Sequence, residues 1–578
     1  MTGPAAPKDP EKARPFFYIL KDKDIFGERQ KDGTGIQFIY ESDGRLINSA
    51  QITGNVTDKE ELTLLETVEG FGRLVHSIGV SVETDRPEET AEFVFQMYGK
   101  KDLYGGGTNL TASLKCDGME HRIYLSDYRW TEDDHVPGQI KILFAAPERM
   151  GKVSVRLFLN DGYEAPSEEE DLVIDMHSEE YCGMISRSLL QLGNPYRIRK
   201  AIEKSKAGKE VTLAYIGGSI TQGAGAIPIH TECYAYKSFQ LFQNRFSTQN
   251  NVRFIKAGVG GTPSELGMIR FDRDVLREGE RPDIVVIEFA VNDEGDETKG
   301  VCYESLVRKV LKLPWKPAVV LLFSVFANDW NLQERLRPVG DLYDLPMVSI
   351  RDAVTPQFSL KCGEGRILSK NQFFYDIFHP NNTGHTIMAD CLQYLFERCD
   401  AAEPARVGTF VEGMTEEQIL SEKLFGPAVI GADFERIFLL DKKNRYVGAK
   451  IRTGSFTSTD IELQSVEMDG SLTQTPEFPY NWMYDGSRPQ MPGFEMEITC
   501  KSLFLIFKDS GEMDVGKADV FVNDVYCMTA DPHKNNWLHC NAVLLFWETE
   551  SRSHKVRITV TEEDQNKKFT ILGFGYTI

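Results

Sequence analysis

Residues 211–223 read VTLAYIGGSITQG, and this stretch indicates the fold of the middle of the chain. Its first seven residues form a short, dense apolar run, which is typical of a strand buried on both faces of a parallel sheet. The glycines that follow permit a tight turn. A serine in such a turn, at the carboxyl end of a strand, can present its hydroxyl and its own backbone N–H to a ligand. The stretch therefore predicts a buried strand that brings Ser219 to the edge of a sheet.

Several known motifs compete for the same glycines. A P-loop requires a lysine after its last glycine, and none follows Gly223 or Gly225. The dinucleotide fingerprint GxGxxG is absent from the segment. The nucleophile elbow GxSxG fails because Thr221 stands where its second glycine belongs. From this segment alone, a glycine-rich turn with an ordinary surface serine stays open beside a catalytic serine.

Similar apolar runs recur further along the chain, and helical patterns separate them. The runs are VRFIKAG (252–258), DIVVIEFA (283–290), AVVLLFSVF (318–326) and LPMVSI (345–350). Strands that alternate with helices predict a parallel sheet that is covered on both faces. We therefore expect residues 181–402 to form a flavodoxin-like α/β/α sandwich around a five-stranded parallel sheet. Open parallel sheets bind ligands at the carboxyl ends of their strands, so these strand ends are the expected place of the chemistry.

The two flanks of this unit show a different pattern. Apolar and polar residues alternate along short runs such as AEFVFQMY before it and KSLFLIFKD after it. Alternation with period two, interrupted by Gly, Asp, Asn and Pro, predicts antiparallel strands with one buried face. We therefore expect an N-terminal β-sandwich over residues 1–180 and a C-terminal β-sandwich over residues 403–578. Carbohydrate binding is a candidate role for the second of them.

Length and charge narrow the class of protein. The 578 residues predict several domains rather than one core. The 65 basic and 87 acidic residues give a formal net charge of −22. Because so negative a surface repels phosphate backbones and anionic lipid headgroups, we expect no nucleic-acid partner and no membrane partner. A neutral substrate fits this charge better, and the oligomeric state stays open.

Three features of the sequence bear on the compartment of the protein. The chain has no apolar run of about 20 residues, the length that a membrane-spanning helix needs. Its start, MTGPAAPKDPEKARPFF, lacks the apolar stretch of a secretory signal. The 10 cysteines show no CxxC pair, which is typical of buried thiols in a reducing compartment rather than of disulfides or a zinc site. The sequence predicts a cytoplasmic protein.

Polar residues suited to catalysis follow several of the predicted strands. The run at 252–258 leads into VGGTPS (259–264), a turn that exposes backbone N–H groups just before a helix. The run at 283–290 leads into Val291-Asn292-Asp293, and Asp376-Ile377-Phe378-His379 follows the last strand. Because the carboxyl ends of parallel strands meet at one edge, these groups are expected to lie near Ser219.

This set and order of segments resembles the SGNH, or GDSL-type, hydrolases over roughly residues 205–400. Four blocks carry the resemblance, and they read GGSIT, AGVGGT, AVND and DIFHPN. The resemblance implies an esterase fold and a catalytic role for five positions. Ser219 would be the nucleophile, the N–H groups of Ser219 and Gly261 and the side chain of Asn292 would be oxyanion donors, and His379 would be the base oriented by Asp376.

Two positions depart from the family pattern. The usual GDS is GGS here, so Gly218 replaces an aspartate. The usual GxND is AVND here, so Ala290 replaces a glycine. These departures leave the subfamily open and do not touch the nucleophile.

The chemistry of the residues supports the same roles. Serine is a weak nucleophile at neutral pH and needs a base within hydrogen-bond reach, and histidine has the suitable pKa. The α/β unit holds His230, His379 and His385. His230 lies in a segment that looks like loop, where it lines a pocket or is simply exposed, and His385 lies at a helix start, which favours a structural role. Asp376 precedes His379 by three residues, so it either orients the imidazole or caps a turn.

No metal and no cofactor is expected. The chain has no HExxH motif, no clustered histidine pair and no carboxylate cage. Acyl transfer to water through a serine, a histidine and an aspartate needs none of them.

The substrate is the least visible feature. The flanking domains resemble, in size and strand style only, the accessory domains of multidomain carbohydrate acetylesterases. Candidate sugar contacts are Asn328, Asp329 and Trp330 after the fourth strand and Trp482 and Trp537 in the C-terminal domain, although capping and packing are the alternatives. We expect a serine esterase that removes short acyl groups, foremost acetyl, from oligosaccharides. A lipid esterase or thioesterase on the same fold and a catalytically inert glycan-binding protein are the alternatives.

Overall fold

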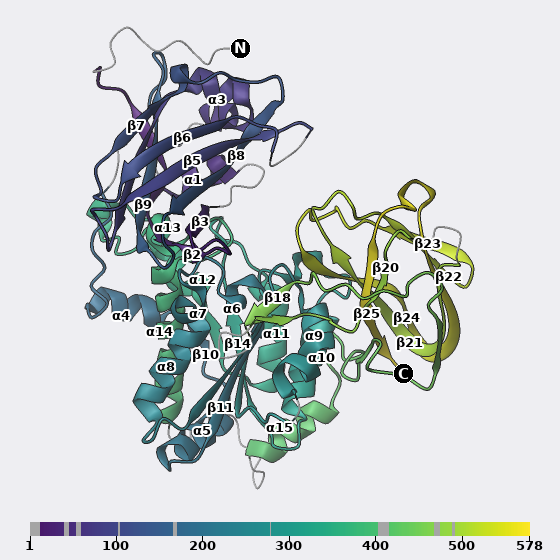
Figure 1. Cartoon of the computed structure of the whole chain (residues 1–578). Coiled ribbons are helices and arrows are strands. Elements are labelled where there is room, and N and C mark those ends of the chain that lie inside the picture. Colours follow the sequence, from purple (N-terminus) through teal and green to yellow (C-terminus); the bar gives the residue numbers. More distant parts are fainter. Residues whose placement is uncertain are drawn as a thin grey trace.

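The structure is a computed structural model, and three parts follow one another along the chain (Figure 1). A β-rich N-terminal part precedes a central part in which helices surround a sheet, and a β-rich C-terminal part follows. The residues that the structure describes are 12–39, 45–53, 59–101, 105–165, 170–277, 279–402, 416–467, 474–487 and 492–578.

The central sheet has six strands in the order β10–β15–β14–β13–β11–β12. They are β10 (Leu189–Gln191), β15 (Met347–Ser349), β14 (Ala318–Phe323), β13 (Ile284–Glu288), β11 (Val211–Gly217) and β12 (Val252–Gly258). The strands from β15 to β12 are parallel, whereas β10 pairs antiparallel with β15. The sequence analysis did not foresee β10, because its three residues are only half-buried and carry no apolar run.

Both faces of this sheet are covered, which explains why its strands are apolar throughout. In β11, Leu213 and Tyr215 belong to the core on one face, and Ala214 and Ile216 belong to the core on the other. Helices that contribute to the first core are α4 (Glu179–Ser186), α5 (Tyr196–Lys206), α8 (Tyr234–Phe246), α12 (Ile350–Phe358) and α14 (Asn382–Asp400). Helices that contribute to the second are α9 (Ser264–Phe271), α10 (Val301–Leu311), α11 (Gln333–Tyr343) and α15 (Glu416–Phe425). The central part is therefore an α/β/α sandwich.

The order of the strands determines where on the sheet a binding crevice can form. The chain runs from β11 to its neighbour β12 and then returns to β13 on the other side of β11. Loops that leave β11 and β13 therefore diverge at their carboxyl ends, where doubly wound sheets form their binding crevice. Three short helices lie in connections that follow β strands or precede α14: α6 (Ser219–Gln222), α7 (Ile229–Glu232) and α13 (Lys370–Phe373).

The N-terminal part is a β-sandwich with one core between two antiparallel sheets. One sheet holds β1 (Phe16–Phe26), β9 (Met150–Leu159), β4 (Val75–Thr84) and β7 (His121–Tyr124). The other holds β2 (Glu28–Arg29), β3 (Gly35–Ile39), β8 (Asp134–Phe144), β5 (Thr90–Gly99) and β6 (Asn109–Lys115). The period-two alternation did not reveal three helices of this domain, α1 (Arg45–Ile52), α2 (Lys59–Thr63) and α3 (Val68–Leu74).

The C-terminal part is β-rich as expected, but its main strands belong to one hydrogen-bonded sheet rather than to two separate ones. The sheet holds β16 (Phe438–Leu440), β17 (Ala449–Arg452), β20 (Trp482–Tyr484), β21 (Phe494–Asp509), β22 (Ala518–Val522), β23 (Val525–Ala530), β24 (His539–Val560) and β25 (Phe569–Thr577). The physical reason is the length of β21 and β24, which are 16 and 22 residues long and pair with each other from Phe494–Ile558 to Asp509–His539, with register shifts midway. A separate hairpin consists of β18 (Ser465–Glu467) and β19 (Gln474–Pro476).

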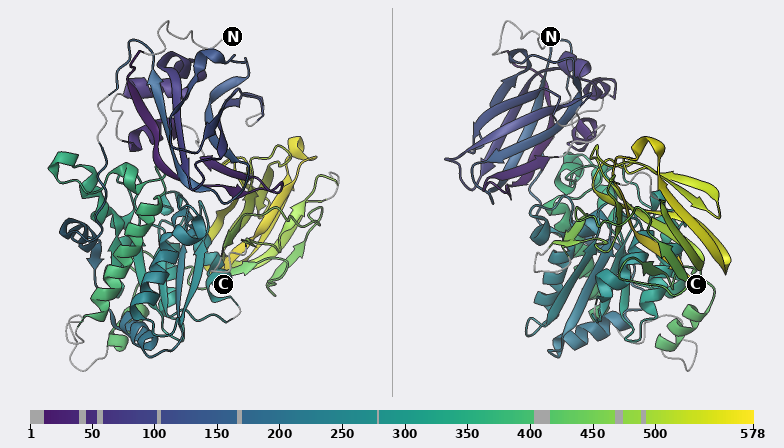
Figure 2. Two further views of the ribbon diagram at one scale, coloured as in Figure 1. Left: turned by 60° about the vertical axis from the view of Figure 1, so that its left-hand side comes forward. Right: turned by 45° about the vertical axis from the view of Figure 1, so that its right-hand side comes forward.

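The C-terminal part packs closely on the central part. Helix α15, which the predicted boundary at residue 403 assigns to the C-terminal domain, contributes Leu420 and Leu424 to the second core of the central sheet. The boundary itself lies outside the described residues. Figures 1 and 2 show the N-terminal sandwich above the end of the central sheet that carries α6, with the C-terminal domain beside it. Among the described helices, none is both long and apolar enough to cross a bilayer.

Candidate active site

Three side chains form a hydrogen-bonded chain at the carboxyl edge of the central sheet. Ser219 opens α6 directly after β11, and Asp376 and His379 lie in the loop between α13 and α14. The Ser219 hydroxyl Oγ lies 2.9 Å from His379 Nε2, and His379 Nδ1 lies 2.9 Å from Asp376 Oδ2. Because the carboxylate accepts from Nδ1, Nε2 is left to accept the serine proton. This arrangement suits nucleophilic attack by Ser219.

Asp376 both shapes its loop and bonds the imidazole. Its Oδ1 accepts the backbone N–H groups of Phe378 at 2.7 Å and of His379 at 2.9 Å, so the turn predicted as its alternative role is also present. Burial acts to raise the pKa of the Asp376 carboxyl, but the nearby His379 and these hydrogen bonds hold it below the usual value. Asp376 is thus kept ionised beside the imidazole.

The three candidate oxyanion donors follow the carboxyl ends of three neighbouring strands, β11, β12 and β13. Gly261 lies in the turn after β12 with a φ of 71°, a left-handed conformation that favours glycine. Among the described residues, none accepts a hydrogen bond from the backbone N–H of Ser219 or Gly261 or from the amide group of Asn292. These donors are therefore free to bind an oxyanion that forms on a substrate.

The glycine before the nucleophile has a steric explanation. A Cβ atom at Gly218 would lie 2.2 Å from Asn292 Oδ1 and 2.5 Å from Asn292 Nδ2. The carboxamide of Asn292 therefore occupies the space that a side chain at position 218 would need. A side chain at position 218 would therefore require Asn292 to move.

Replacing Asn292 by alanine is expected to lower kcat about 100–1,000-fold, because a preorganised oxyanion donor is worth roughly that factor. The measurement is steady-state hydrolysis of 4-nitrophenyl acetate by the purified variant. Asn566→Ala, at an exposed position in the C-terminal domain, is a control for an asparagine far from the oxyanion set in the sequence. Unchanged kcat in Asn292→Ala would remove this residue from the oxyanion hole.

The neighbouring polar residues have structural roles. His385 is buried, accepts the Tyr234 N–H on Nδ1 at 3.1 Å and donates from Nε2 to the Ala224 carbonyl at 3.1 Å. Burial lowers its pKa to about 3, so it stays neutral. Asp293 accepts the Ser264 N–H at 2.7 Å, which ties the start of α9 to the loop after β13. His230 is half-buried in α7.

A buried carboxyl group beneath the site escaped the sequence analysis. Glu288 ends β13, is fully buried and accepts a hydrogen bond from Thr221 Oγ1 at 3.1 Å. Burial raises its pKa to about 7. The signal in the sequence is an acidic residue inside the apolar run DIVVIEFA.

Aromatic rings lead away from the histidine. Phe378 packs edge-on against His379 with ring centroids 6.1 Å apart, and Phe326 and Trp330 continue the row at 5.1 and 5.8 Å. Phe378 is 41% exposed beside the reacting groups, a position that the sequence analysis did not single out. Trp330 is therefore joined to His379 through two intervening rings, and its predicted contact with a sugar stays a prediction.

The polar residues before Trp330 are exposed, and each has a partner within the protein. Asn328 Oδ1 accepts the Trp330 N–H at 3.2 Å, and Asp329 forms an ion pair with Lys370 at 3.1 Å. Their predicted substrate contacts stay predictions.

The two candidate tryptophans of the C-terminal domain differ in exposure and in location. Trp537 is 44% exposed, and its ring would lie 2.8 Å from a Cβ atom at Gly261, so it borders the oxyanion turn. The prediction for Trp482 is wrong. This residue is only 4% exposed and packs on Phe494 and Phe574 inside the domain core, which leaves no ring face for a sugar.

The N-terminal domain also touches the catalytic loop. Lys23 in β1 is 3% exposed, and its Nζ donates to the carbonyls of Asn371, at 3.3 Å, and Phe374. Burial lowers its pKa to about 8, while the carboxylate of Asp376 acts in the opposite direction. Lys23 thus ties the first domain to the segment just before Asp376.

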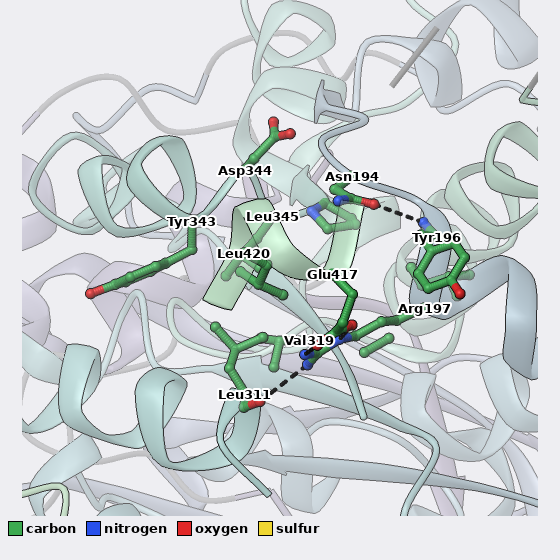
Figure 3. Close-up of a pocket in the computed structure, with 13 residues that line it drawn as sticks. Asn194, Tyr196, Arg197, Leu311, Val319, Tyr343, Asp344, Leu345, Glu417 and Leu420 are labelled. Atoms are coloured by element: carbon green, nitrogen blue, oxygen red, sulfur yellow. Dashed lines mark hydrogen bonds and ion pairs between the residues drawn. The ribbon is translucent and has the colours of Figure 1, made fainter. Parts of the chain in front are cut away.

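A small cavity lies at the other edge of the sheet (Figure 3). Its lining includes Ala318, where β14 begins, and Arg197, which forms an ion pair with Glu417 at 2.7 Å. The volume is about 20 Å³, enough for little more than one water molecule. Within the described part of the chain, no group of three or more His, Cys, Asp or Glu side chains is placed to hold a metal ion.

Fold and site together define the class of protein. An α/β/α sandwich that brings a serine, a glycine turn, an asparagine and a histidine to successive strand ends is the arrangement of an SGNH-type ester hydrolase. Residues 215–387 match the model of the GDSL-like lipase/acylhydrolase family. The match lies within the central domain, which is therefore similar to the GDSL-like lipases and acylhydrolases, and it supports an esterase enzyme.

Solved structures with a similar fold include a two-domain esterase active on acetylated mannans. The two proteins are 24% identical with a TM-score of 0.54, over 68% of this chain and 98% of that one. The same esterase co-crystallised with mannopentaose gives 24% identity, a TM-score of 0.53 and the same coverage. Among curated protein sequences, none matches this chain significantly.

Proposed function

We propose that this protein hydrolyses short acyl esters, foremost O-acetyl esters, on oligosaccharides. The observation that carries the proposal is the chain of hydrogen bonds from Ser219 through His379 to Asp376, beside three free oxyanion donors. The protein of similar fold acts on acetylated mannans, which supports an acetylated sugar as the first substrate to test. A net charge of −22 suits neutral sugars better than acidic polymers.

The reaction runs in two halves. Ser219 Oγ attacks the ester carbonyl while His379 Nε2 takes its proton, and the Ser219 and Gly261 N–H groups and the Asn292 amide bind the oxyanion. Collapse of this intermediate breaks the ester bond, and His379 returns the proton to the departing sugar hydroxyl. His379 then takes a proton from a water molecule, which attacks the acyl-enzyme and releases acetate and Ser219.

The sugar is proposed to lie between the aromatic side chains at the mouth of the site. Trp330 continues the aromatic row that begins at Phe378 beside His379, and Trp537 borders the turn of Gly261, so both are candidates for stacking on a sugar ring. Exposed Asn328 and Asp329 can bond sugar hydroxyls.

The test is a mass-spectrometric deacetylation screen on acetylated mannan, xylan and pectin oligosaccharides. We expect loss of acetyl groups from neutral oligosaccharides, with mannan and xylan preferred over acidic pectin. Activity on 4-nitrophenyl esters that rises from two to eight acyl carbons would instead favour the lipid-ester alternative. Failure of a fluorophosphonate probe to label Ser219 would favour an inert glycan-binding protein.

A further inference from the structure

The glycine turn that bears one oxyanion donor is held by the C-terminal domain. Gln464, just before β18, donates from Nε2 to the Gly260 carbonyl at 3.1 Å. His539, the first residue of β24, lies with Nε2 3.1 Å from the Gly261 carbonyl. A carbonyl only accepts, so His539 is the donor. Figure 1 shows β18 reaching from the C-terminal part to the central part near α6.

The first of these contacts sets the direction of the oxyanion donor. The carbonyl of Gly260 and the N–H of Gly261 belong to one planar trans peptide, so they point in opposite directions. Fixing the carbonyl with Gln464 therefore fixes the N–H. A hydrogen bond to the carbonyl also polarises the peptide and strengthens the N–H as a donor. His539 holds the next peptide plane, so the planes on both sides of the Gly261 Cα are anchored.

The side chains of Gln464 and His539 are each held in place by a further contact. Gln464 is buried, and its Oε1 accepts the Cys540 N–H at 3.0 Å. His539 is buried, and its Nδ1 lies 3.0 Å from Oδ2 of the fully buried Asp509. Neither donor can turn away without breaking a second hydrogen bond.

The central domain anchors the turn only at its two ends. Thr262 Oγ1 donates to the Val259 carbonyl at 2.8 Å, and the Ser264 N–H donates to Asp293. No described residue of the central domain donates to the carbonyls of Gly260 or Gly261. The orientation of the donor peptide is thus set from more than 200 residues away in the sequence.

We propose that Gln464 and His539 are positioning residues of the oxyanion hole, so that the C-terminal domain takes part in the hydrolysis itself. The proposal rests on the esterase function proposed above and concerns residues that do not touch the reacting atoms. It predicts that changing Gln464 lowers kcat and leaves KM unchanged, because the ground-state ester makes little use of the oxyanion donor.

The experiment uses the full chain with Gln464→Glu. This change keeps an oxygen that can accept from the Cys540 N–H, but it replaces the donor to the Gly260 carbonyl by a second oxygen, which cannot donate. We expect kcat for 4-nitrophenyl acetate to fall about 100-fold, as for a misplaced catalytic group. Methylboronic acid forms a tetrahedral adduct on serine, so its inhibition constant should rise by a similar factor, whereas KM for 4-nitrophenyl acetate should stay as in the unmodified protein. Gln565→Glu makes the same charge change at an exposed site of the same domain and should match the unmodified protein.

A second variant tests the same inference independently, in case Gln464→Glu does not fold. His539→Phe keeps a ring but removes the donor to Gly261, while Asp509 keeps its hydrogen bond from Asn535. It should lower kcat in the same direction. If either variant keeps its thermal unfolding midpoint, its kcat and its affinity for methylboronic acid, the inference is overturned while the esterase function stands. An unmodified protein that hydrolyses no ester would overturn both.

Discussion

Ser219→Ala is expected to lower kcat for acetyl esters about 10⁴–10⁶-fold, to the rate that binding and the oxyanion donors alone sustain. The serine Oγ is the atom bonded to His379 at 2.9 Å, and the described residues offer no second hydroxyl in that position. Alanine removes the nucleophile and leaves the backbone N–H in place. The expected result is therefore a chain that folds and binds substrate but does not turn it over.

The measurement combines steady-state hydrolysis with labelling by a fluorophosphonate probe, which should be lost completely. Ser359→Ala is a matched control, because this exposed serine of the same domain makes only a local bond to the Pro356 carbonyl. The control should keep both activity and label. Deacetylation that persists in Ser219→Ala would sink the proposed mechanism.

Asp376→Asn is expected to lower kcat about 10⁴-fold through the wrong tautomer of the histidine, the size of the effect known for the Ser-His-Asp triad of other hydrolases. The asparagine carbonyl can replace Oδ1, which accepts the N–H groups of Phe378 and His379, so the loop should be preserved. Its amide group then faces His379 Nδ1 in place of Oδ2. Since an amide N–H donates, Nδ1 must accept, and the imidazole proton moves to Nε2, where it can no longer take the proton of Ser219.

Tests of this second prediction compare kcat with folding. The thermal unfolding midpoint should stay close to that of the unmodified protein, and residual activity should rise at high pH, where the serine needs less help from a base. Asp341→Asn removes an exposed ion pair with Arg337 in α11 and is the matched control. Near-normal turnover by Asp376→Asn would show that His379 does not depend on this carboxylate.

The active site draws on all three parts of the chain. The central sheet supplies Ser219, Asn292 and the histidine loop, the N-terminal sandwich holds that loop through Lys23, and the C-terminal domain holds the oxyanion turn through Gln464 and His539. Apart from any contact with a sugar, the flanking domains therefore hold loops at the carboxyl edge of the central sheet in place.

Local motifs explain what could be predicted from the sequence. Ser219 and Asn292 each follow an apolar run that is buried on both faces, and Asp376 precedes His379 within one turn of chain. Parallel strands bring such segments to one edge whatever the intervening helices are. The expected roles of these residues came from the resemblance of the four sequence blocks to the SGNH hydrolases. The same reasoning missed β10, which is too short to have a pattern, and Trp482, whose burial depends on the rings of Phe494 and Phe574.

By itself the sequence determined that the middle of this chain is an α/β hydrolase unit with Ser219 at a strand end, because hydrophobic periodicity and short motifs act over a few residues. Only the tertiary structure decided that Asn292 occupies the space beside Gly218, and that Gln464 and His539 hold the turn at Gly260 and Gly261. These contacts join residues far apart in the sequence. Such pairings depend on how whole domains pack, which no local pattern of side chains records.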